Sequence, residues 1–347
     1  MAGSAIATQA SYGVIVRESV RGPSDQQGHT GSWRTFVSER GFCHVNLFVG
    51  ITDPGWFNYL SARSPGEVNF WRPSGIGFEA LSSGEPFLFR LRDQGQIVGG
   101  GFFVRSSKLP LSLAWLAFEE RNGSASRDEL WRTITGIRRG QGKPPEPDPV
   151  IGNIVLIEPF FWPRDRWIPY RNRIGNNKRL NTEDPAGAQL WNEVQERLRA
   201  EPRYEELETI GAEDPVEQVR RWALERMGQG AFRISVTEAY QRQCAVTHEH
   251  ALPVLEAAHI LPVADHGSHS VSNGILLRAD LHILFDRGYI TFDENYRLLV
   301  SGRLEAEWHN GREYLSRKGQ RIALPHDRMD WPSQKRLAVH RETVFVA

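Results

Sequence analysis

Cysteine is scarce in this sequence: its 347 residues include only Cys43 and Cys244, which lie far apart. This count excludes a disulfide-rich scaffold and a zinc site with four cysteine ligands, and it fits the reducing cytoplasm. Long hydrophobic runs are absent too, because no stretch approaches the roughly 18 apolar residues of a membrane span. Met1–Gly13 also lacks the Lys or Arg of a signal peptide. We therefore expect a cytoplasmic protein that does not bind a membrane.

Net charge is also missing, since 42 Lys and Arg residues balance 42 Asp and Glu residues. A binder that relies on overall positive charge is thereby excluded, and any contact with nucleic acid must come from a local patch. The charges are unevenly spread. Residues 131–182 carry ten basic and four acidic residues, whereas residues 183–217 carry three and eleven. The neutral total is therefore the sum of a basic and an acidic stretch.

Composition and apolar patterning divide the chain into four segments and predict an α+β protein. Residues 1–44 are weakly patterned and predict an N-terminal extension. Residues 45–182 contain short strand-like runs with few helices, which indicates a small, curved mixed sheet or barrel. Residues 183–227 are acidic and predict a helical, solvated connector. Residues 228–347 hold most of the histidines, with nine of the 11 at or after His248.

Local patterns predict individual elements within these segments. Apolar runs predict strands over residues 45–51, 68–71, 86–91, 97–104 and 151–157. Helical spacing predicts a short helix opened by Pro54, and further helices over 113–118, 128–137, 184–200, 232–240 and 280–287. Residues 289–300 read as a hairpin. The triplet Gly99–Gly101 inside a strand indicates a bulge or a close approach of backbone.

Three polar residues of the last segment stand in the order strand, loop, helix. His259 closes a strand-like run, Asn273 lies in the next loop, and His282 lies in a short predicted helix, so the spacings are 14 and 9. A lone histidine is more often an ordinary surface or core residue. Three such residues in this frame indicate a site with shared chemistry.

These residues and the strings around them resemble the HNH nucleases over residues 228–347. The strings Ala257-Ala-His-Ile260, Asn273-Gly-Ile-Leu-Leu-Arg278 and His282-Ile-Leu-Phe-Asp-Arg-Gly288 are similar to the subgroup found in modification-dependent restriction endonucleases. The resemblance implies a ββα-metal fold and a metal-dependent endodeoxyribonuclease. His259 is then the general base, because a histidine near neutrality can take a proton from water. Asn273 orients that base, and His282 binds the metal.

The resemblance also implies one divalent metal ion, which neutralises charge on the phosphate and on the leaving oxygen. We expect Mg²⁺, with Mn²⁺ or Ni²⁺ as alternatives. Asp286 lies one turn after His282 and is a second candidate ligand, the alternative being a helix-end contact. Relatives often carry an acidic residue or histidine directly before the base, where this chain has Ala258, so Glu256 is the candidate substitute. Because Cys244 lacks the partners of a zinc knuckle, no structural zinc is expected.

Residues 45–182 resemble the PUA-like family of small barrels, which includes the EVE, YTH and ASCH groups. The resemblance rests on Gly84-Glu-Pro-Phe-Leu-Phe89, Ile97-Val-Gly-Gly-Gly101 and Asn69-Phe-Trp71. Members read modified bases, often by flipping the base into an aromatic pocket. The pocket candidates are Trp56, Asn69, Phe70, Trp71, Trp115 and Trp162, with ordinary core packing as the alternative. Candidates for phosphate contacts are Arg138, Arg139, Lys143, Arg171, Arg173, Lys178 and Arg179, with Arg278 and Arg287 beside the metal helix.

Our leading hypothesis is a modification-dependent DNA endonuclease for restriction or phage defence, acting on double-stranded DNA that carries a modified base such as a modified cytosine. A homodimer is expected, because one active site cuts one strand. Two alternatives remain open. The first is an HNH nuclease triggered by phosphorothioate DNA or a signalling nucleotide. The second is a non-catalytic DNA-binding protein with a decayed metal site, which Ala258 motivates.

Overall fold

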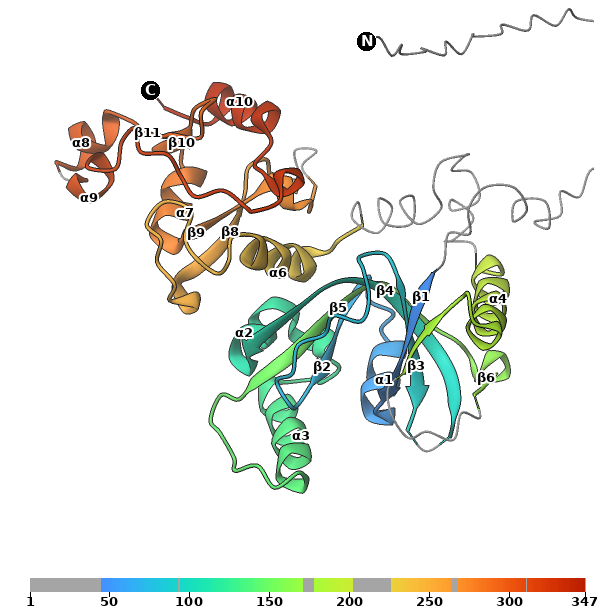
Figure 1. Ribbon diagram of the computed structural model, residues 1–347. Helices are drawn as coiled ribbons and strands as arrows, with labels where there is room; N and C mark the ends of the chain where they lie inside the picture. Colours follow the sequence, from blue (N-terminus) through green and yellow to red (C-terminus); the bar gives the residue numbers. More distant parts are fainter. Residues whose placement is uncertain are drawn as a thin grey trace, which may run out of the picture. The chain divides into compact units, whose positions relative to one another are not determined.

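A mixed sheet of seven strands forms the first part of the chain that the structure describes (Figure 1). The structure is a computed structural model and describes residues 45–92, 94–170, 178–201, 226–263, 268–309 and 311–346, so the predicted extension over 1–44 lies outside it. The described strands follow the order β2-β5-β4-β3-β1-β7, with β6 paired to β4. They are β1 (Asn46–Thr52), β2 (Glu67–Arg72), β3 (Pro86–Leu91), β4 (Gln96–Pro110), β5 (Val150–Phe161), β6 (Ile168–Pro169) and β7 (Lys178–Asn181).

Every strand expected in this region is present, although β4 is longer than its pattern indicated. β1 runs parallel to β3, and the other recorded pairings of this sheet are antiparallel. The two ends of the path, β2 and β7, are not paired with each other among the described strands. The α+β class is confirmed, and the PUA-like barrel stays a prediction.

The glycine triplet of β4 lies where the neighbouring strand comes very close. A Cβ atom at Gly99 would collide with the backbone carbonyl oxygen of Phe160, and one at Gly100 would lie 2.5 Å from that residue's ring. The register between β4 and β5 shifts between Gly100 and Phe102. The predicted bulge and close approach are therefore confirmed, and a side chain at either position would force the two strands apart.

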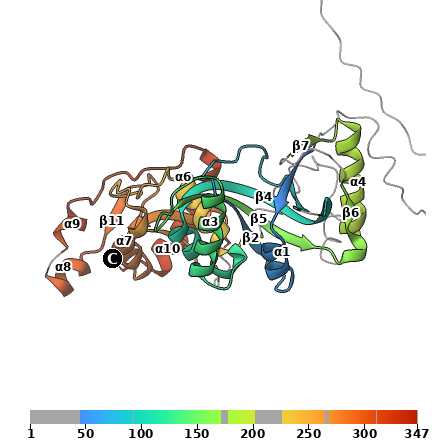
Figure 2. The ribbon, with the colours of Figure 1, turned by 90° about the horizontal axis from the view of Figure 1, so that it is seen from below.

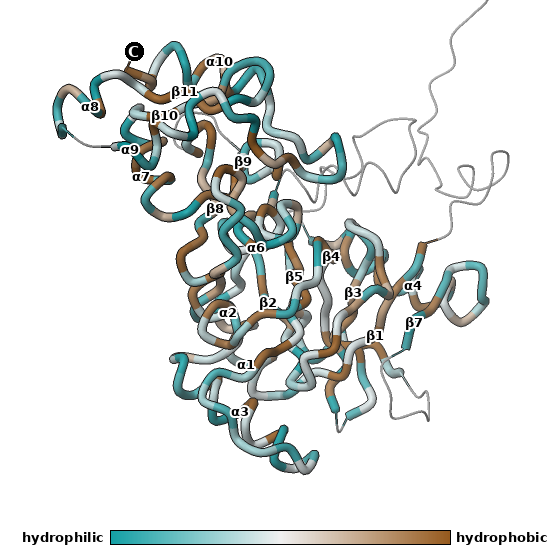
Figure 3. The backbone as a smooth tube through the Cα atoms, turned by 60° about the vertical axis from the view of Figure 1, so that its left-hand side comes forward, coloured by the Kyte–Doolittle hydropathy of each residue, from teal (hydrophilic) through white to brown (hydrophobic). Residues whose placement is uncertain are grey.

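Helices cover the sheet where the sequence predicts them. They are α1 (Pro54–Ser61), α2 (Leu111–Phe118), α3 (Arg127–Gly140) and α4 (Pro185–Arg199). Helix α1 begins after Asp53, whose carboxylate accepts hydrogen bonds from the backbone N–H groups of Gly55 (2.8 Å) and Trp56 (3.2 Å). Figure 3 shows the contrast between the strands, where hydrophobic colour gathers, and α3 with the loop after it, which are mainly hydrophilic.

The second part of the chain begins with α6 (Gln229–Ala239) and contains two small hairpins. Strands β8 (Leu255–His259) and β9 (Gly274–Arg278) pair antiparallel, and α7 (Ala279–Asp286) packs against both (Figure 1). Figure 2 shows α7 again in the view from below. The predicted strand–loop–helix order is therefore confirmed. The remaining elements are β10 (Ile290–Phe292), β11 (Leu298–Val300), α8 (Arg303–Trp308), α9 (Arg312–Leu315) and α10 (Gln334–Thr343). No helix in the described ranges has both the length and the apolar character needed to cross a membrane.

Helix α6 joins the sheet to the second part of the chain. It packs against α2, β4 and β5 on the sheet side and against β8 and β9 on the other. At its first turn, the buried carboxylate of Glu67 in β2 accepts hydrogen bonds from the backbone N–H groups of Gly230 (2.9 Å) and Ala231 (2.8 Å). One hydrophobic cluster runs through both parts and includes Val155 of the sheet, Phe232 of α6 and Leu281 of α7. The cap on α6 is thus supplied by the sheet.

Candidate active site

His259 is the last residue of β8 and lies opposite Gly274 of β9. Its ring stacks on the ring of Phe232, with centroids 3.9 Å apart and planes 12° apart. A Cβ atom at position 274 would lie 2.9 Å from the Phe232 ring and 2.5 Å from a methyl group of Val236. Glycine at position 274 therefore leaves room for the phenylalanine that fixes the plane of the histidine.

A second histidine contacts His259. The Nε2 atom of His259 lies 3.2 Å from Nδ1 of His269, which belongs to the loop that returns towards β9. The sequence patterns did not single out His269. The signal that could have found it is its position four residues before Asn273, because a loop that closes back on β8 brings its last residues to the end of that strand.

Burial keeps both histidines uncharged at neutral pH. It lowers the pKa of His259 from 6.5 to about 4, and the nearby His269 and His282 lower it further, since each would place a second positive charge beside it. Burial also lowers the pKa of His269, against the attraction of the Glu67 carboxylate. A neutral imidazole can accept a proton, so His259 is in the form that a general base needs, with a pKa below the near-neutral value expected from the sequence.

His282 lies between two carboxylates. Its Nδ1 atom lies 2.7 Å from Oε2 of Glu256 in β8, and its Nε2 atom lies 3.3 Å from Oδ2 of Asp286, four residues later in α7. Burial raises the pKa of Asp286, with His282 lowering it and the negative charge of Glu256 raising it further. The structure thus brings the three predicted metal ligands together, and it places His259 in a separate set of contacts with Phe232 and His269.

The donor set of these three residues fits a divalent cation. Two carboxylates share one imidazole, so negative charge exceeds positive charge there, and an oxygen–nitrogen set suits Mg²⁺ or Mn²⁺ as well as softer ions. Within the described ranges no three His, Cys, Asp or Glu side chains converge on one point in ligand geometry. Each ring nitrogen of His282 faces a carboxylate, so a cation would replace one of these two contacts.

Asn273 is buried and holds the loop after β8. Its Nδ2 donates to the backbone oxygens of Leu261 (2.9 Å) and Ser268 (2.8 Å), and its Oδ1 accepts from the N–H of Leu261 at 3.1 Å. Both amide hydrogens and the amide oxygen of Asn273 are thus bonded to this loop. These are the contacts that bracing the loop requires, and its part in catalysis stays a prediction.

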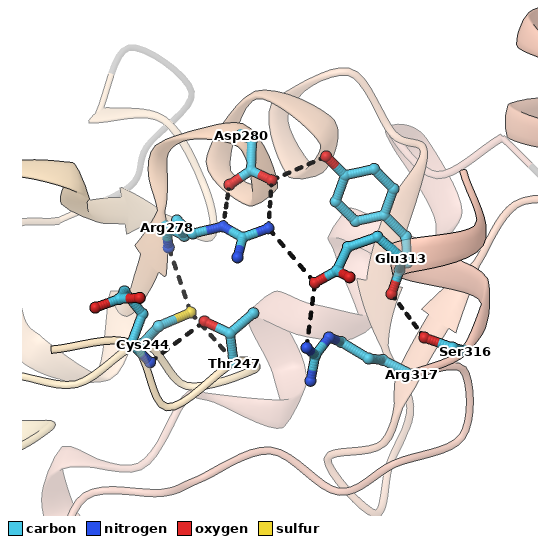
Figure 4. Close-up of polar contacts among 9 residues, drawn as sticks. Cys244, Thr247, Arg278, Asp280, Glu313, Ser316 and Arg317 are labelled. Atoms are coloured by element: carbon cyan, nitrogen blue, oxygen red, sulfur yellow. Dashed lines mark hydrogen bonds and ion pairs between the residues drawn. The ribbon is translucent and has the colours of Figure 1, made fainter. Parts of the chain in front are cut away.

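Arg278 is engaged in ion pairs at the start of α7 (Figure 4). Its guanidinium forms two hydrogen bonds with Asp280, at 2.7 and 2.8 Å, and lies 3.8 Å from the carboxylate of Glu313. The backbone N–H of Arg278 also donates to Sγ of Cys244 at 3.3 Å, and that sulfur accepts a second bond from the N–H of Thr247. Cys244 thus anchors a turn to β9 through hydrogen bonds.

Residues 244–293 match the family model described as HNH endonuclease. The chain carries an HNH endonuclease domain. The match includes β8, β9 and α7, and therefore both histidines, His269 and the two carboxylates, whereas Phe232 of α6 lies before it. It confirms the resemblance seen in the sequence. Nucleases of this kind generally use a divalent metal ion.

One solved structure that is similar to this chain is the modification dependent TagI restriction endonuclease. The similarity covers 76% of this chain and 62% of that chain, with 11% sequence identity and a TM-score of 0.27. The chain thus spans less than two thirds of the length of that enzyme. No curated protein sequence matches this chain.

Outside the HNH domain, four of the six pocket candidates lie together. The Trp56 ring packs edge-on to Phe70, and its Nε1 donates to the backbone oxygen of Asn69 at 3.3 Å. Asn69 and Trp71 both bond to Asn122, through its side chain and its backbone respectively. Of these four, Trp56 and Asn69 are buried and the other two half-buried.

The other two pocket candidates lie in different apolar clusters. Trp115 packs with Trp71 and Trp131 around Leu130 and Ile134. Trp162 is buried in the large cluster that also contains Phe160. The structure therefore does not bring all six residues around one point, and a base-reading pocket stays a prediction.

The candidates for phosphate contacts differ in exposure. Arg138 is buried and pairs with Glu146, whereas Lys143 is half-buried. Those fully exposed are Arg139, Lys178, Arg179 and Arg287. Arg171 and Arg173 lie outside the described residues. The exposed members are those available to a DNA backbone, and their contacts with it stay predictions.

Proposed function

We propose that this protein hydrolyses phosphodiester bonds of double-stranded DNA, with His259 as the general base of an HNH active site. The observation that carries the proposal is the uncharged, oriented state of His259 inside the matched segment. Phe232 fixes its ring plane, His269 occupies its Nε2, and burial holds its pKa near 4. A base held neutral and in one orientation is what proton abstraction from water requires.

One tautomer of the contact with His269 leaves Nδ1 of His259 to take the proton. When Nε2 of His259 carries a hydrogen and donates it to Nδ1 of His269, the lone pair lies on Nδ1 of His259. That Nδ1 has no recorded partner among the described residues, so it is available to accept a proton from the attacking water. The charge that then develops on His259 is stabilised by the lone pair of His269.

We propose His282 as the principal metal ligand, with Asp286 as the second and Glu256 as a partner that holds the ring. The shorter contact, between Nδ1 and Glu256, is the kind that orients a ligating histidine, whereas the longer contact to Asp286 is the one that a cation can replace. Mg²⁺ is the proposed ion. When bound, the ion neutralises charge on the phosphate and the leaving oxygen.

We further propose that cleavage depends on a modified base and serves restriction or phage defence in the cytoplasm, by a homodimer that cuts both strands. The support is the resemblance of residues 45–182 to modified-base readers and one feature of their interior. Oδ1 of Asn69 is buried and has no hydrogen-bond partner among the described residues, while Nδ2 of the same side chain donates to Asn122 and Asn153. Such an acceptor can pair with an amino group on a base edge.

The test is a cleavage panel with purified protein. Plasmids carrying methylcytosine, hydroxymethylcytosine, phosphorothioate linkages or no modification are incubated with Mg²⁺, Mn²⁺ or Ni²⁺. We expect cleavage of a base-modified plasmid and loss of about 10²–10⁴-fold in rate for His259→Ala. The control His326→Ala removes an exposed histidine of the same domain and keeps the wild-type rate. Full activity of His259→Ala would refute the assignment, and cleavage of phosphorothioate DNA alone would favour a different trigger.

A further inference from the structure

Arg336, in the first turn of α10, has three hydroxyl partners and no carboxylate partner among the described residues. Its Nη1 lies 3.0 Å from Oγ of Ser270 and 3.2 Å from Oγ of Ser272, and its Nη2 lies 3.1 Å from Oγ of Ser268. Arg341, on the same helix, instead pairs with Glu294 at 2.8 Å. The half-buried charge of Arg336 is thus surrounded by neutral groups.

This arrangement leaves a positive charge uncompensated. Burial lowers the pKa of Arg336, and no neighbouring carboxylate counteracts it. The first turn of α10 contains no acidic residue, and it adds Lys335 to Arg336 at the end of the helix where backbone dipoles already favour negative charge. Partly buried charges are normally paired, so the missing partner points to an anion supplied from outside the chain.

The serines that hold Arg336 belong to the loop beside the general base. Ser268 and Ser270 flank His269, whose Nδ1 contacts His259, and Ser272 directly precedes Asn273. The backbone N–H of Ser333, the N-cap of α10, also donates to the backbone oxygen of Ser272, at 2.9 Å. An anion bound at Arg336 would therefore contact the loop that carries His269.

We propose that Arg336, with Ser268, Ser270 and Ser272, binds a backbone phosphate of DNA adjacent to the phosphodiester that is cut. A guanidinium has five N–H donors in a planar fork that matches phosphate, and the three serine contacts leave part of that fork free. The three hydroxyls also bond to one another, at 2.9 Å between Ser268 and Ser270 and 3.3 Å between Ser270 and Ser272. These two bonds use two of the three hydroxyl hydrogens, and the third can be donated to a phosphate oxygen. This inference rests on the proposed nuclease function and adds a residue that positions its substrate.

The test measures how DNA affinity depends on salt. Each protein carries His259→Ala to prevent cleavage, and its binding to a fluorescently labelled duplex of every kind in the cleavage panel is followed by anisotropy between low and moderate salt. A plot of log K against log salt has a negative slope, and loss of one phosphate contact reduces the magnitude of that slope by about 1. We expect this decrease for Arg336→Gln. The matched control Arg341→Gln removes a charge already paired with Glu294 and keeps the slope.

A purely structural Arg336 would behave differently. It would pin α10 to the serine loop, so Arg336→Gln would lower the melting temperature and leave the salt slope unchanged, and that result would overturn the inference. Should Arg336→Gln fail to fold, Ser270→Ala keeps the arginine in place. Its loss of a hydrogen bond to a charged group is expected to weaken DNA binding about tenfold, and an unchanged affinity would equally overturn the inference.

The outcomes separate this inference from the proposed function. If the wild-type protein cuts DNA and the slope of Arg336→Gln is unchanged, only the phosphate site is wrong. If the slope decreases as expected and no metal supports cleavage by the wild-type protein, the nuclease function is wrong and the phosphate site stands. If the wild-type protein neither binds nor cuts any DNA of the panel, both are wrong.

Discussion

The stack of Phe232 on His259 determines how cleavage should respond to acid. With a pKa of about 4, His259 is about nine-tenths neutral at pH 5, whereas a histidine at the reference value of 6.5 would be about 3% neutral. The proton-accepting form of the base is therefore kept almost unchanged from pH 7 down to pH 5. The wild-type rate should fall only as the pH passes through about 4.

Replacing Phe232 should raise the pH at which the cleavage rate begins to fall. Phe232→Ala exposes one face of His259 and removes part of the burial that lowers the pKa, so the pKa rises towards 6.5. The ratio of the rate at pH 5 to the rate at pH 7 then falls, by up to about twentyfold if the reference value is reached. Truncating a buried phenylalanine also costs about 3–5 kcal/mol of stability, so folding must be verified by circular dichroism at each pH.

Single-turnover cleavage at saturating metal between pH 4 and pH 8 measures both effects. The matched control is Phe292→Ala, which removes an equally buried ring of β10 outside the contacts of His259 and should leave the pH profile where it is. A wild-type profile that already falls near pH 6.5 would refute the reasoning. So would a Phe232→Ala profile that coincides with the wild type in its acidic limb.

Three further predictions concern other residues of the second part of the chain. Burial lowers the pKa of His340 in the folded protein to about 4, whereas in the unfolded chain this histidine binds a proton near pH 6.5. The folded state therefore loses stability as the pH falls from about 6.5 to 4. His340→Gln should make the melting temperature decline less steeply over this pH range. Gly274→Ala should lower the free energy of unfolding, measured by chemical denaturation, by about 1–3 kcal/mol. Adding Val236→Ala should restore part of this loss, because the added methyl group would lie against Val236, and strictly additive losses would contradict the close contact. His282→Ala should abolish cleavage at low Mg²⁺, and Asp286→Asn should raise the Mg²⁺ concentration at half-maximal rate about 10–100-fold; calorimetry that finds wild-type metal affinity in both variants would contradict their assignment as ligands.

Local elements of this fold could be predicted because their signals are local. Asp53 and Pro54 mark the start of α1, the run Pro86–Leu91 is one buried strand, and the triplet Gly99–Gly101 shows where two strands touch. The strand–loop–helix frame of His259, Asn273 and His282 is likewise encoded within a short stretch. In each case the pattern and the contact that explains it lie within a few residues of each other or in one pair of strands.

Contacts between distant segments had no such signal. Glu67 accepts hydrogen bonds from residues 163 and 164 positions later, and no periodicity in β2 indicates a partner there. His269 meets His259 only because the loop between them folds back, and Arg336 reaches the same loop from α10. Trp162 lies in a different cluster from Trp56 and Trp71 for the same reason: composition shows how many aromatic rings there are and leaves open which core each one enters.

The carboxylate of Glu67 has a consequence for exchanging parts of this protein. The helix that presents Phe232 to the general base starts on an acceptor that belongs to β2, and a Cβ atom at Gly228 would collide with that carboxylate, while one at Gly230 would lie 2.7 Å from the backbone oxygen of Ala117. A chimera that grafts another domain in front of residue 226 would leave two buried N–H groups without an acceptor unless the new domain brings an acid to the same place. The sheet and the part of the chain that carries His259 therefore have to be exchanged together.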